Sequence, residues 1–262
     1  MALLSQLSKI AAAGLILTST SAVADTDVKI YTQNIFAHVF CKNADSTTKF
    51  KNYIKDNQFD FILTQEYEGE CAGLFDEIKS MGYTIATGNP GDSTLFYKNT
   101  DWTPQTEYTV DTTYNTPDGW GHDGTRKAVI GVYQKNGTGA TLAMSTAHLC
   151  VAYPGNGKTS ECVKPQPQAH AEDFQTLMNQ LSPNANWLIA GDMNAPVGEK
   201  NGLYGILTQN QAKNVDELNN QNFDMAFYKG DAIQNFSYKN TADALPNISD
   251  HNGFVLSFTL KD

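Results

Sequence analysis

Runs of apolar and β-branched residues predict that the chain is rich in β-strands. Residues 28–35 alternate in polarity, which is typical of a strand, whereas residues 59–64 and 187–190 are continuous apolar runs suited to strands buried on both faces. Further strands are expected at residues 83–86, 93–98, 106–112, 126–134, 140–149, 223–228, 234–238 and 253–260. The strands therefore outnumber the helices.

A smaller set of segments has the spacing of amphipathic helices. In the first of them, Phe50, Tyr53 and Ile54 share one helical face. These segments are residues 46–57, 74–81, 166–181 and 202–209, and a long polar loop is expected at residues 115–125. Many strands alternating with three or four helices predict an α/β (α+β) fold, with two packed mixed sheets and helices outside. No linker divides the chain, so we expect a single domain over residues 25–262.

The first 24 residues have the pattern of a secretory signal peptide. Lys9 is the only charged residue there, residues 10–17 form an apolar segment, and Ala22-Val23-Ala24 is a small-x-small cleavage site. The apolar segment is too short to span a bilayer. We therefore expect cleavage near Ala24 and a secreted or periplasmic protein, the alternative being an ordinary N-terminal helix. No other stretch has the length and apolar character of a transmembrane segment.

The mature chain carries four cysteines, and an even count in an exported protein favours two disulfides. Four cysteines allow three pairings. We prefer Cys41 with Cys71, which would join two loops that follow strands, and Cys150 with Cys162, which would close a loop. A zinc site fits less well, because the cysteine spacings are long and the chain has no Cys-x-x-Cys pair.

The composition permits a folded core but disfavours a generally basic surface. The chain has 262 residues, of which 40% are hydrophobic and 18% charged, and its formal net charge is -10. This charge argues against binding long nucleic acid through a basic face. It leaves a nuclease open, because a bound divalent cation can offset negative charge locally.

Polar residues of a metal-binding type follow several predicted strands. Asp192 and Asn194 come just after the run at residues 187–190, with Gly191 expected to let the backbone turn. Two residues apart in extended chain, their side chains point the same way, and their oxygens suit a hard cation such as Mg²⁺. The alternative is an Asx-turn. Similar residues lie within other predicted strands or next to their ends. They are Asn34, Gln65, Glu66, His148, Asp224, Asp250 and His251.

Six short motifs stand in a characteristic order between residues 28 and 258. They are T-Q-N at 32–34, L-T-Q-E at 63–66, S-T-A-H-L at 145–149, G-D-M-N at 191–194, F-D-M-A-F at 223–227 and S-D-H at 249–251. This ordered set resembles the endonuclease/exonuclease/phosphatase superfamily, which has the deoxyribonuclease I-like fold. The resemblance implies a four-layered α/β sandwich, with two mixed sheets flanked by helices and the site at one end of the sheets.

The resemblance also implies a metal site. Glu66 matches the principal Mg²⁺ ligand of the family, with Mn²⁺ and Ca²⁺ as alternative ions. Asn34 matches a residue that supports the metal or a phosphate oxygen, and Asp192 and Asp250 match residues close to the metal. Mg²⁺ suits phosphodiester hydrolysis, because it neutralises the charge of the phosphate in the transition state.

The remaining motif residues match the catalytic groups of the family. His251 would accept a proton from the attacking water, and Asp224 would fix its tautomer, although Met225 and Ala226 depart from the usual motif around this Asp. Asp192 and Asn194 would orient the nucleophile and bind metal or phosphate. His148 would contact the phosphate or assist the leaving group, and Arg126 is a weaker candidate for gripping the phosphate. We expect the other histidines, His38, His122 and His170, to lie on the surface.

Three functions compete, and the first is favoured. It is a secreted Mg²⁺-dependent endonuclease that cuts DNA and works as a monomer. The second is an enzyme of the same fold that acts on a phospholipid head group, such as a sphingomyelinase or an inositol-phosphate phosphatase. The third is a non-catalytic binding or toxin module, which the full set of catalytic motif residues disfavours. The expected partner is a phosphodiester substrate, with nucleic acid favoured over phospholipid.

Overall fold

The computed structural model describes most of the chain that follows the predicted signal peptide. It describes residues 25–67, 69–88, 90–113, 126–151, 162, 164–195, 213–214 and 224–262. The signal peptide, the polar loop at 115–125 and the helix at 202–209 lie outside the described residues, so they stay predictions.

Six strands form the first sheet, in the spatial order β11-β12-β1-β2-β4-β3. Their bounds are β1 Thr26–Asn34, β2 Phe61–Gln65, β3 Tyr83–Ile85, β4 Ser93–Lys98, β11 Ile233–Asn240 and β12 Phe254–Leu260. Only β1 and β2 run parallel, and the other neighbouring pairs are antiparallel. The sheet is therefore mixed, as the sequence predicts.

The second sheet repeats this design, in the order β5-β6-β7-β8-β10-β9. Its strands are β5 Trp102–Asp111, β6 Lys127–Lys135, β7 Thr141–His148, β8 Trp187–Asp192, β9 Lys213–Asn214 and β10 Asp224–Lys229. Its one parallel pair is β7 with β8. Each sheet thus has two parallel strands near its centre and antiparallel strands on either side.

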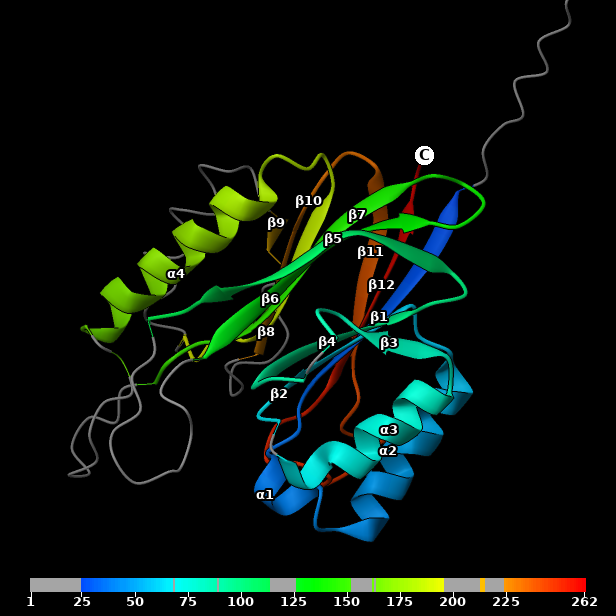
Figure 1. The fold of residues 1–262 in the computed structure, drawn as a ribbon, viewed down its shortest axis with the longest axis vertical. Helices are drawn as coiled ribbons and strands as arrows, with labels where there is room; N and C mark the ends of the chain where they lie inside the picture. The colour runs from blue at the N-terminus through cyan, green and yellow to red at the C-terminus, as the bar shows by residue number, and fades with distance from the viewer. Residues whose placement is uncertain are drawn as a thin grey trace, which may run out of the picture.

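Helices cover the outer faces of the two sheets (Figure 1). Their bounds are α1 Ala37–Phe40, α2 Ala44–Asn57, the 3₁₀ turn η1 Gly69–Cys71, α3 Ala72–Ser80 and α4 Gln166–Leu181. Helices α2 and α3 pack on the first sheet, and α4 packs on the second. The predicted four-layered sandwich is confirmed. Within the described ranges, no helix is both long and apolar enough to cross a membrane.

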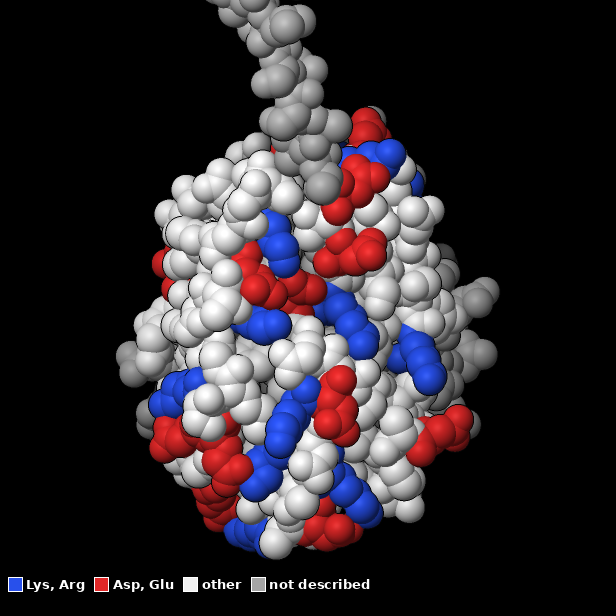
Figure 2. All heavy atoms as spheres, turned by 90° about the vertical axis from the view of Figure 1, so that its right-hand side faces the viewer, with Lys and Arg blue, Asp and Glu red and all other residues white. Residues whose placement is uncertain are grey.

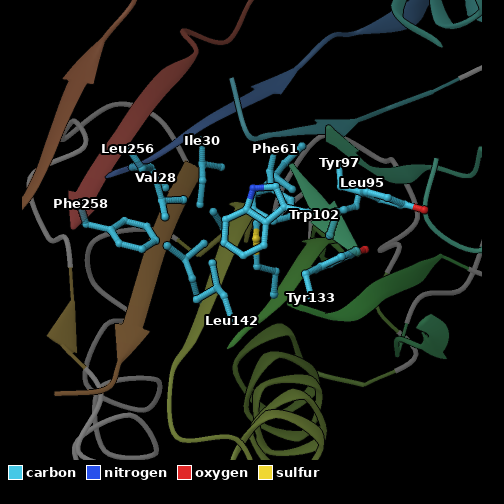
Figure 3. Close-up of a cluster of buried hydrophobic side chains, with 14 of the residues drawn as sticks. Val28, Ile30, Phe61, Leu95, Tyr97, Trp102, Tyr133, Leu142, Leu256 and Phe258 are labelled. Carbon is cyan, nitrogen blue, oxygen red and sulfur yellow. The ribbon is translucent and has the colours of Figure 1, made fainter. Parts of the chain in front are cut away.

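Strand alternation distributes apolar side chains between the layers. On β1, Val28 and Ile30 enter the core between the sheets, whereas Tyr31 joins the cluster under α2 and α3. Figure 3 shows the inter-sheet core, in which Phe61 and Trp102 lie with ring centroids 4.8 Å apart. Helix α2 begins two residues before the predicted start, because the Asn43 side chain accepts hydrogen bonds from the first-turn amides.

Two disulfides join the predicted cysteine pairs. Cys41 bonds Cys71, and Cys150 bonds Cys162. The first joins the segments that follow β1 and β2, and the second begins two residues after β7. Both disulfides therefore lie just beyond strands that end at the same edge of the molecule, where the motif residues gather.

Candidate active site

The inner faces of both sheets become polar at one end of the sandwich. On β1 the inward positions run from Ile30 through Thr32 to Asn34, and on β7 they run from Met144 through Thr146 to His148. Strands β2 and β8 end at the same edge because they run parallel to β1 and β7. Strands β4, β10 and β12 begin there because they are antiparallel to these neighbours. The topology therefore brings motif residues from distant parts of the chain to one edge.

Asn34 joins the two halves of this site. Its Nδ2 donates to Oε1 of Glu66 and to Oδ2 of Asp192, each at 2.9 Å, while its Oδ1 accepts from the amide of Phe36. Glu66 directly follows β2 of the first sheet and Asp192 ends β8 of the second, so one amide group holds carboxylates from both halves together. Asn34 orients the two predicted metal ligands in this arrangement.

The paired carboxylates fit a hard divalent cation. Glu66, His148 and Asp192 each place a potential ligand atom within 4.8 Å of the others. Burial raises the pKa of Glu66, and the nearby charges of Asp192 and Asp92 add to this rise against the opposing effects of His148 and Asn34. Glu66 also has the left-handed backbone conformation, with φ at 63°, which is uncommon for this residue type. A cation bound here would offset the negative charges of Glu66 and Asp192 at this strained, largely buried position.

His251 and Asp224 form a tight pair. Nδ1 of His251 lies 2.7 Å from Oδ2 of Asp224, and Nε2 lies 3.7 Å from Oδ2 of Asp192. The antiparallel register of β10 with β8 sets Asp224 directly opposite Asp192. Burial opposes the protonated ring, but the hydrogen bond to Asp224 and the charges of Asp192 and Asp250 outweigh it and raise the pKa of His251.

His148 forms a second pair, with a residue that the sequence motifs did not identify. Its Nδ1 lies 3.0 Å from Oδ2 of Asp92, and its Nε2 lies 3.7 Å from Oδ2 of Asp192. The ring is 2% exposed. Burial and the charge of Arg126 act against protonation, yet Asp92 and Asp192 outweigh them and raise the pKa of His148. Asp92 precedes β4, in a segment that the sequence indicates only as a turn.

Asp192 thus lies at the centre of the site. Its Oδ2 is 3.7 Å from Nε2 of both histidines, and its Oδ1 accepts from the backbone amide of Asn194. Burial favours the neutral acid, but His148, His251 and two hydrogen bonds hold the pKa of Asp192 below its usual value. Asp192 is therefore ionised, and it faces two histidines whose other nitrogens are each held by a carboxylate.

The segment after the apolar run departs from the predicted geometry. Strand β8 continues through Gly191 to Asp192, so Gly191 does not make the predicted turn. A side chain at Gly191 would collide with the backbone oxygen of Ala147, because β7 and β8 approach closely there. Asn194 has φ at 46°, and its amide binds Asp192 in the Asx-turn arrangement that was the alternative. Its Nδ2 donates to Leu149 O at 2.9 Å.

Two other predicted site residues, Arg126 and Asp250, lie close to the site, and His170 departs from its prediction. Arg126 donates from Nη1 to Leu149 O at 2.8 Å, and its Nε lies 3.6 Å from Asp92. Asp250 is exposed beside His251, and its Oδ1 accepts weakly from the Ser249 hydroxyl at 3.3 Å. The expectation that His170 lies on the surface is wrong, because this α4 residue is buried and its Nε2 lies 2.8 Å from Cys150 O. The His38 and His122 side chains lie outside the described part.

A further buried contact connects the two sheets directly behind the site. Nε2 of Gln65 donates to Oγ1 of Thr146 at 2.9 Å, so the residue before Glu66 contacts the strand that carries His148. The motifs contain both residues, but their contact depends on how the two sheets pack. It could not be read from either motif alone.

The sequence and the fold both match known proteins. The sequence model of the Endonuclease/Exonuclease/phosphatase family matches residues 32–251. No curated protein sequence matches the chain. Among solved structures, the human nocturnin catalytic domain with bound sulfate anion superposes with a TM-score of 0.66 and 15% identity, covering 90% of this chain and 94% of that chain.

Two further structures show the same fold. One is D. rerio TDP2 complexed with single strand DNA product, with a TM-score of 0.64 and 14% identity over 89% of this chain and 99% of that chain. The other is an endonuclease/exonuclease/phosphatase from Bacteroides vulgatus, with a TM-score of 0.64 and 16% identity over 90% of this chain and 100% of that chain. At these identities the structural likeness establishes the fold alone.

Proposed function

The chain belongs to the endonuclease/exonuclease/phosphatase family of phosphoric ester hydrolases, and we propose that it is a divalent-metal-dependent phosphodiesterase that cuts DNA. One observation carries this proposal. Oδ2 of Asp192 lies 3.7 Å from Nε2 of both His148 and His251. A water molecule or a phosphate oxygen placed between these groups would meet a proton acceptor on one side and a hydrogen-bond donor on the other.

Asp224 and Asp92 determine what the two histidines can do. The Asp224 carboxylate accepts the Nδ1 proton of His251, which leaves Nε2 to accept a proton from water. Asp192 orients that water, because its ionised oxygen faces the same point. Asp92 holds His148 by Nδ1, so a protonated His148 presents Nε2–H to a phosphate oxygen or to the leaving group.

Glu66 and Asp192, oriented by Asn34, would hold the cation. A bound divalent cation would neutralise the phosphodiester and stabilise its transition state. Asp192, one of the two carboxylates that would hold it, is among the groups that raise the pKa of His251. Offsetting the charge of Asp192 would lower that pKa and favour the neutral ring that accepts a proton. The site therefore combines cation binding with activation of the base.

One observation supports a nucleic acid over a lipid as substrate. An enzyme acting at a membrane should expose an apolar patch near its site. Among the described residues, the exposed large hydrophobic side chains are Val39 and Tyr238, which do not form such a patch. On the face shown in Figure 2, basic and acidic side chains are interspersed, so DNA contacts would be confined to the site and its margins.

We also propose that the protein acts after export. The two disulfides support this proposal, since such bonds persist in oxidising compartments. N-terminal sequencing of the protein purified from culture fluid or periplasm should begin near Asp25. An uncleaved N-terminus on protein retained in the cytoplasm would contradict it.

The proposed activity can be tested with residues 25–262 on two substrates, in Mg²⁺ and in EDTA. Nicking of supercoiled plasmid that needs Mg²⁺ and is lost in His251→Ala would support a nuclease. Head-group release from sphingomyelin vesicles without nicking would show that the substrate is a phospholipid. No hydrolysis of either substrate by folded protein with Mg²⁺ would contradict the proposal.

A further inference from the structure

A cavity of about 380 Å³ opens beside the His148–Asp92 pair. It lies between the segment that connects β3 to β4 and the strands β5 and β6. Six of its lining residues carry the argument: Thr87, Asp92, Ser93, Thr109, Lys127 and Val129. Asp92 lines this cavity and also pairs with His148 of the candidate catalytic site, so the cavity adjoins that site.

The strand pattern explains why the cavity opens here. Val129 enters the core between the sheets, and Lys127, two residues earlier on β6, lies on the same face. Thr109 pairs with Val129 in the antiparallel register of β5 and β6, and Asp111 pairs with Lys127. The inward face of the second sheet therefore changes from apolar to polar toward the edge where the catalytic residues lie. The cavity is the mouth of the inter-sheet space on this side.

The chemistry of the lining suits a sugar–phosphate unit. Thr87, Ser93 and Thr109 supply hydroxyl groups, Lys127 supplies a cation, and Val129 supplies an apolar wall. The Ser93 side chain is 1% exposed, and its Oγ has no hydrogen-bond partner among the described residues. A buried hydroxyl without a partner is costly, and a bound ligand or an ordered water molecule would satisfy it.

The charges around the cavity leave Lys127 available to an anion. Its Nζ lies 3.7 Å from Oδ1 of Asp111, and the two side chains are 52% and 73% exposed, so this ion pair is weak. Asp92 contacts both His148 and Arg126, which offset its negative charge. Lys127 can therefore turn to a phosphate without leaving a buried carboxylate uncompensated.

We propose that this cavity is a subsite for one nucleotide of a single DNA strand, next to the scissile phosphate on the His148 side, and that Lys127 pairs with the phosphate of that nucleotide. The inference rests on the proposed nuclease function. It adds to that function where the bound DNA strand would lie relative to His148. The cavity volume of about 380 Å³ lies within the range of small-molecule sites. Recognition would be by phosphate and sugar, which gives position without base sequence.

The test combines a binding assay with a kinetic comparison. Binding of a fluorescent single-stranded octanucleotide to residues 25–262 is measured by anisotropy in EDTA, over a series of salt concentrations. Lys127→Gln should weaken binding about tenfold and should reduce the slope of log affinity against log salt by about 0.7, as expected for the loss of one phosphate contact. Lys79→Gln is the matched control, because Lys79 is a half-exposed α3 lysine that pairs with Asp76. Its affinity and salt slope should equal those of the parent.

The kinetic comparison uses the octanucleotide and bis(p-nitrophenyl) phosphate, a diester too small to reach both the site and the cavity. Lys127→Gln should lower the ratio of kcat/KM on the oligonucleotide to kcat/KM on the small diester about tenfold. Unchanged oligonucleotide affinity in Lys127→Gln, or an unchanged kcat/KM ratio in an active enzyme, would overturn the subsite. Failure of the parent to hydrolyse either substrate would instead count against the proposed function, and the anisotropy would still decide whether the cavity binds a strand.

Discussion

His251 is held between two carboxylates that act on its two ring nitrogens: Asp224 Oδ2 lies 2.7 Å from Nδ1, and Asp192 Oδ2 lies 3.7 Å from Nε2. The first distance is a hydrogen bond, and the second is too long for one but short enough for a single ligand atom beside the two groups to contact both. The geometry therefore assigns different roles to the two carboxylates. Asp224 fixes the tautomer, and Asp192 faces the position of the reacting group.

Asp224→Asn should lower kcat between about 10²-fold and 10⁴-fold, because an amide can donate to Nδ1 and so favour the wrong tautomer. KM should change much less, since Asp224 is buried behind the histidine. Steady-state kinetics on the octanucleotide with saturating Mg²⁺ would measure both constants, and circular dichroism would check the fold. A kcat within threefold of the parent would show that Asp224 does not control His251.

Glu66→Gln should weaken Mg²⁺ binding at least about tenfold, because the variant keeps the side-chain shape and the contact with Asn34 but loses the charge. Isothermal titration calorimetry on the protein without substrate would measure the affinity directly. Glu70→Gln is the control, since Glu70 is an exposed residue of η1 that pairs with Lys42. Equal affinities in Glu66→Gln and the parent would remove Glu66 from the metal site.

A third prediction concerns stability as a function of pH. Asp173 on α4 accepts from the amide and the hydroxyl of Thr113, each at 2.8 Å. Burial outweighs these hydrogen bonds and raises the pKa of Asp173 from 3.8 to about 6. Because the folded-state pKa is the higher one, folding favours the protonated acid. The stability that the protonated form gives is complete below pH 3.8 and is lost as pH rises through about 6.

Asp173→Asn removes this titration. The unfolding free energy of the variant minus that of the parent should therefore rise by about 1–3 kcal/mol between pH 4 and pH 7, after allowance for partial solvent screening. Urea unfolding at several pH values would measure the difference. The lost Thr113 contact adds a constant offset, so the slope with pH is the test, and a flat difference would contradict the assigned pKa.

The local patterns of the sequence were sufficient to predict most of the elements. The apolar run at 187–190 and the helical spacing at 166–181 depend only on neighbouring residues, and both appear as strand β8 and helix α4. The same helical spacing could have placed His170 correctly, since it lies four residues before the buried Phe174 on the α4 face that packs on the sheet. It was placed on the surface because it lies outside the six motifs.

Residues that act through long-range pairing could not be found in this way. Asp92 lies in a turn, and it reaches His148 only because β4 pairs antiparallel with β2 and because the two sheets pack with these ends together. Asn194 was identified as a site residue, but its left-handed backbone turns the segment into an Asx-turn. The motifs therefore give the chemical groups, and the topology gives their partners.

The two disulfides should differ in their effects, because they close loops of different length and hold different parts of the site. Cys41 and Cys71 are 30 residues apart, and the segments that they join begin at Asn34 and Glu66. Cys150 and Cys162 are 12 residues apart and close only the loop after β7. Loop-closure entropy predicts a cost of about 3–4 kcal/mol for removing the first and somewhat less for removing the second.

The double variant Cys41→Ser/Cys71→Ser should therefore lower Tm more than Cys150→Ser/Cys162→Ser does. It should also weaken Mg²⁺ binding at temperatures well below Tm, because the loops that present Asn34 and Glu66 lose their covalent link. Calorimetry would give Tm, and titration at 10 °C would give the cation affinity of each folded variant. A larger loss of Tm in the second variant would contradict the ranking by loop length. An unchanged Mg²⁺ affinity in the first variant would show that the metal site is positioned by the sheet edge alone.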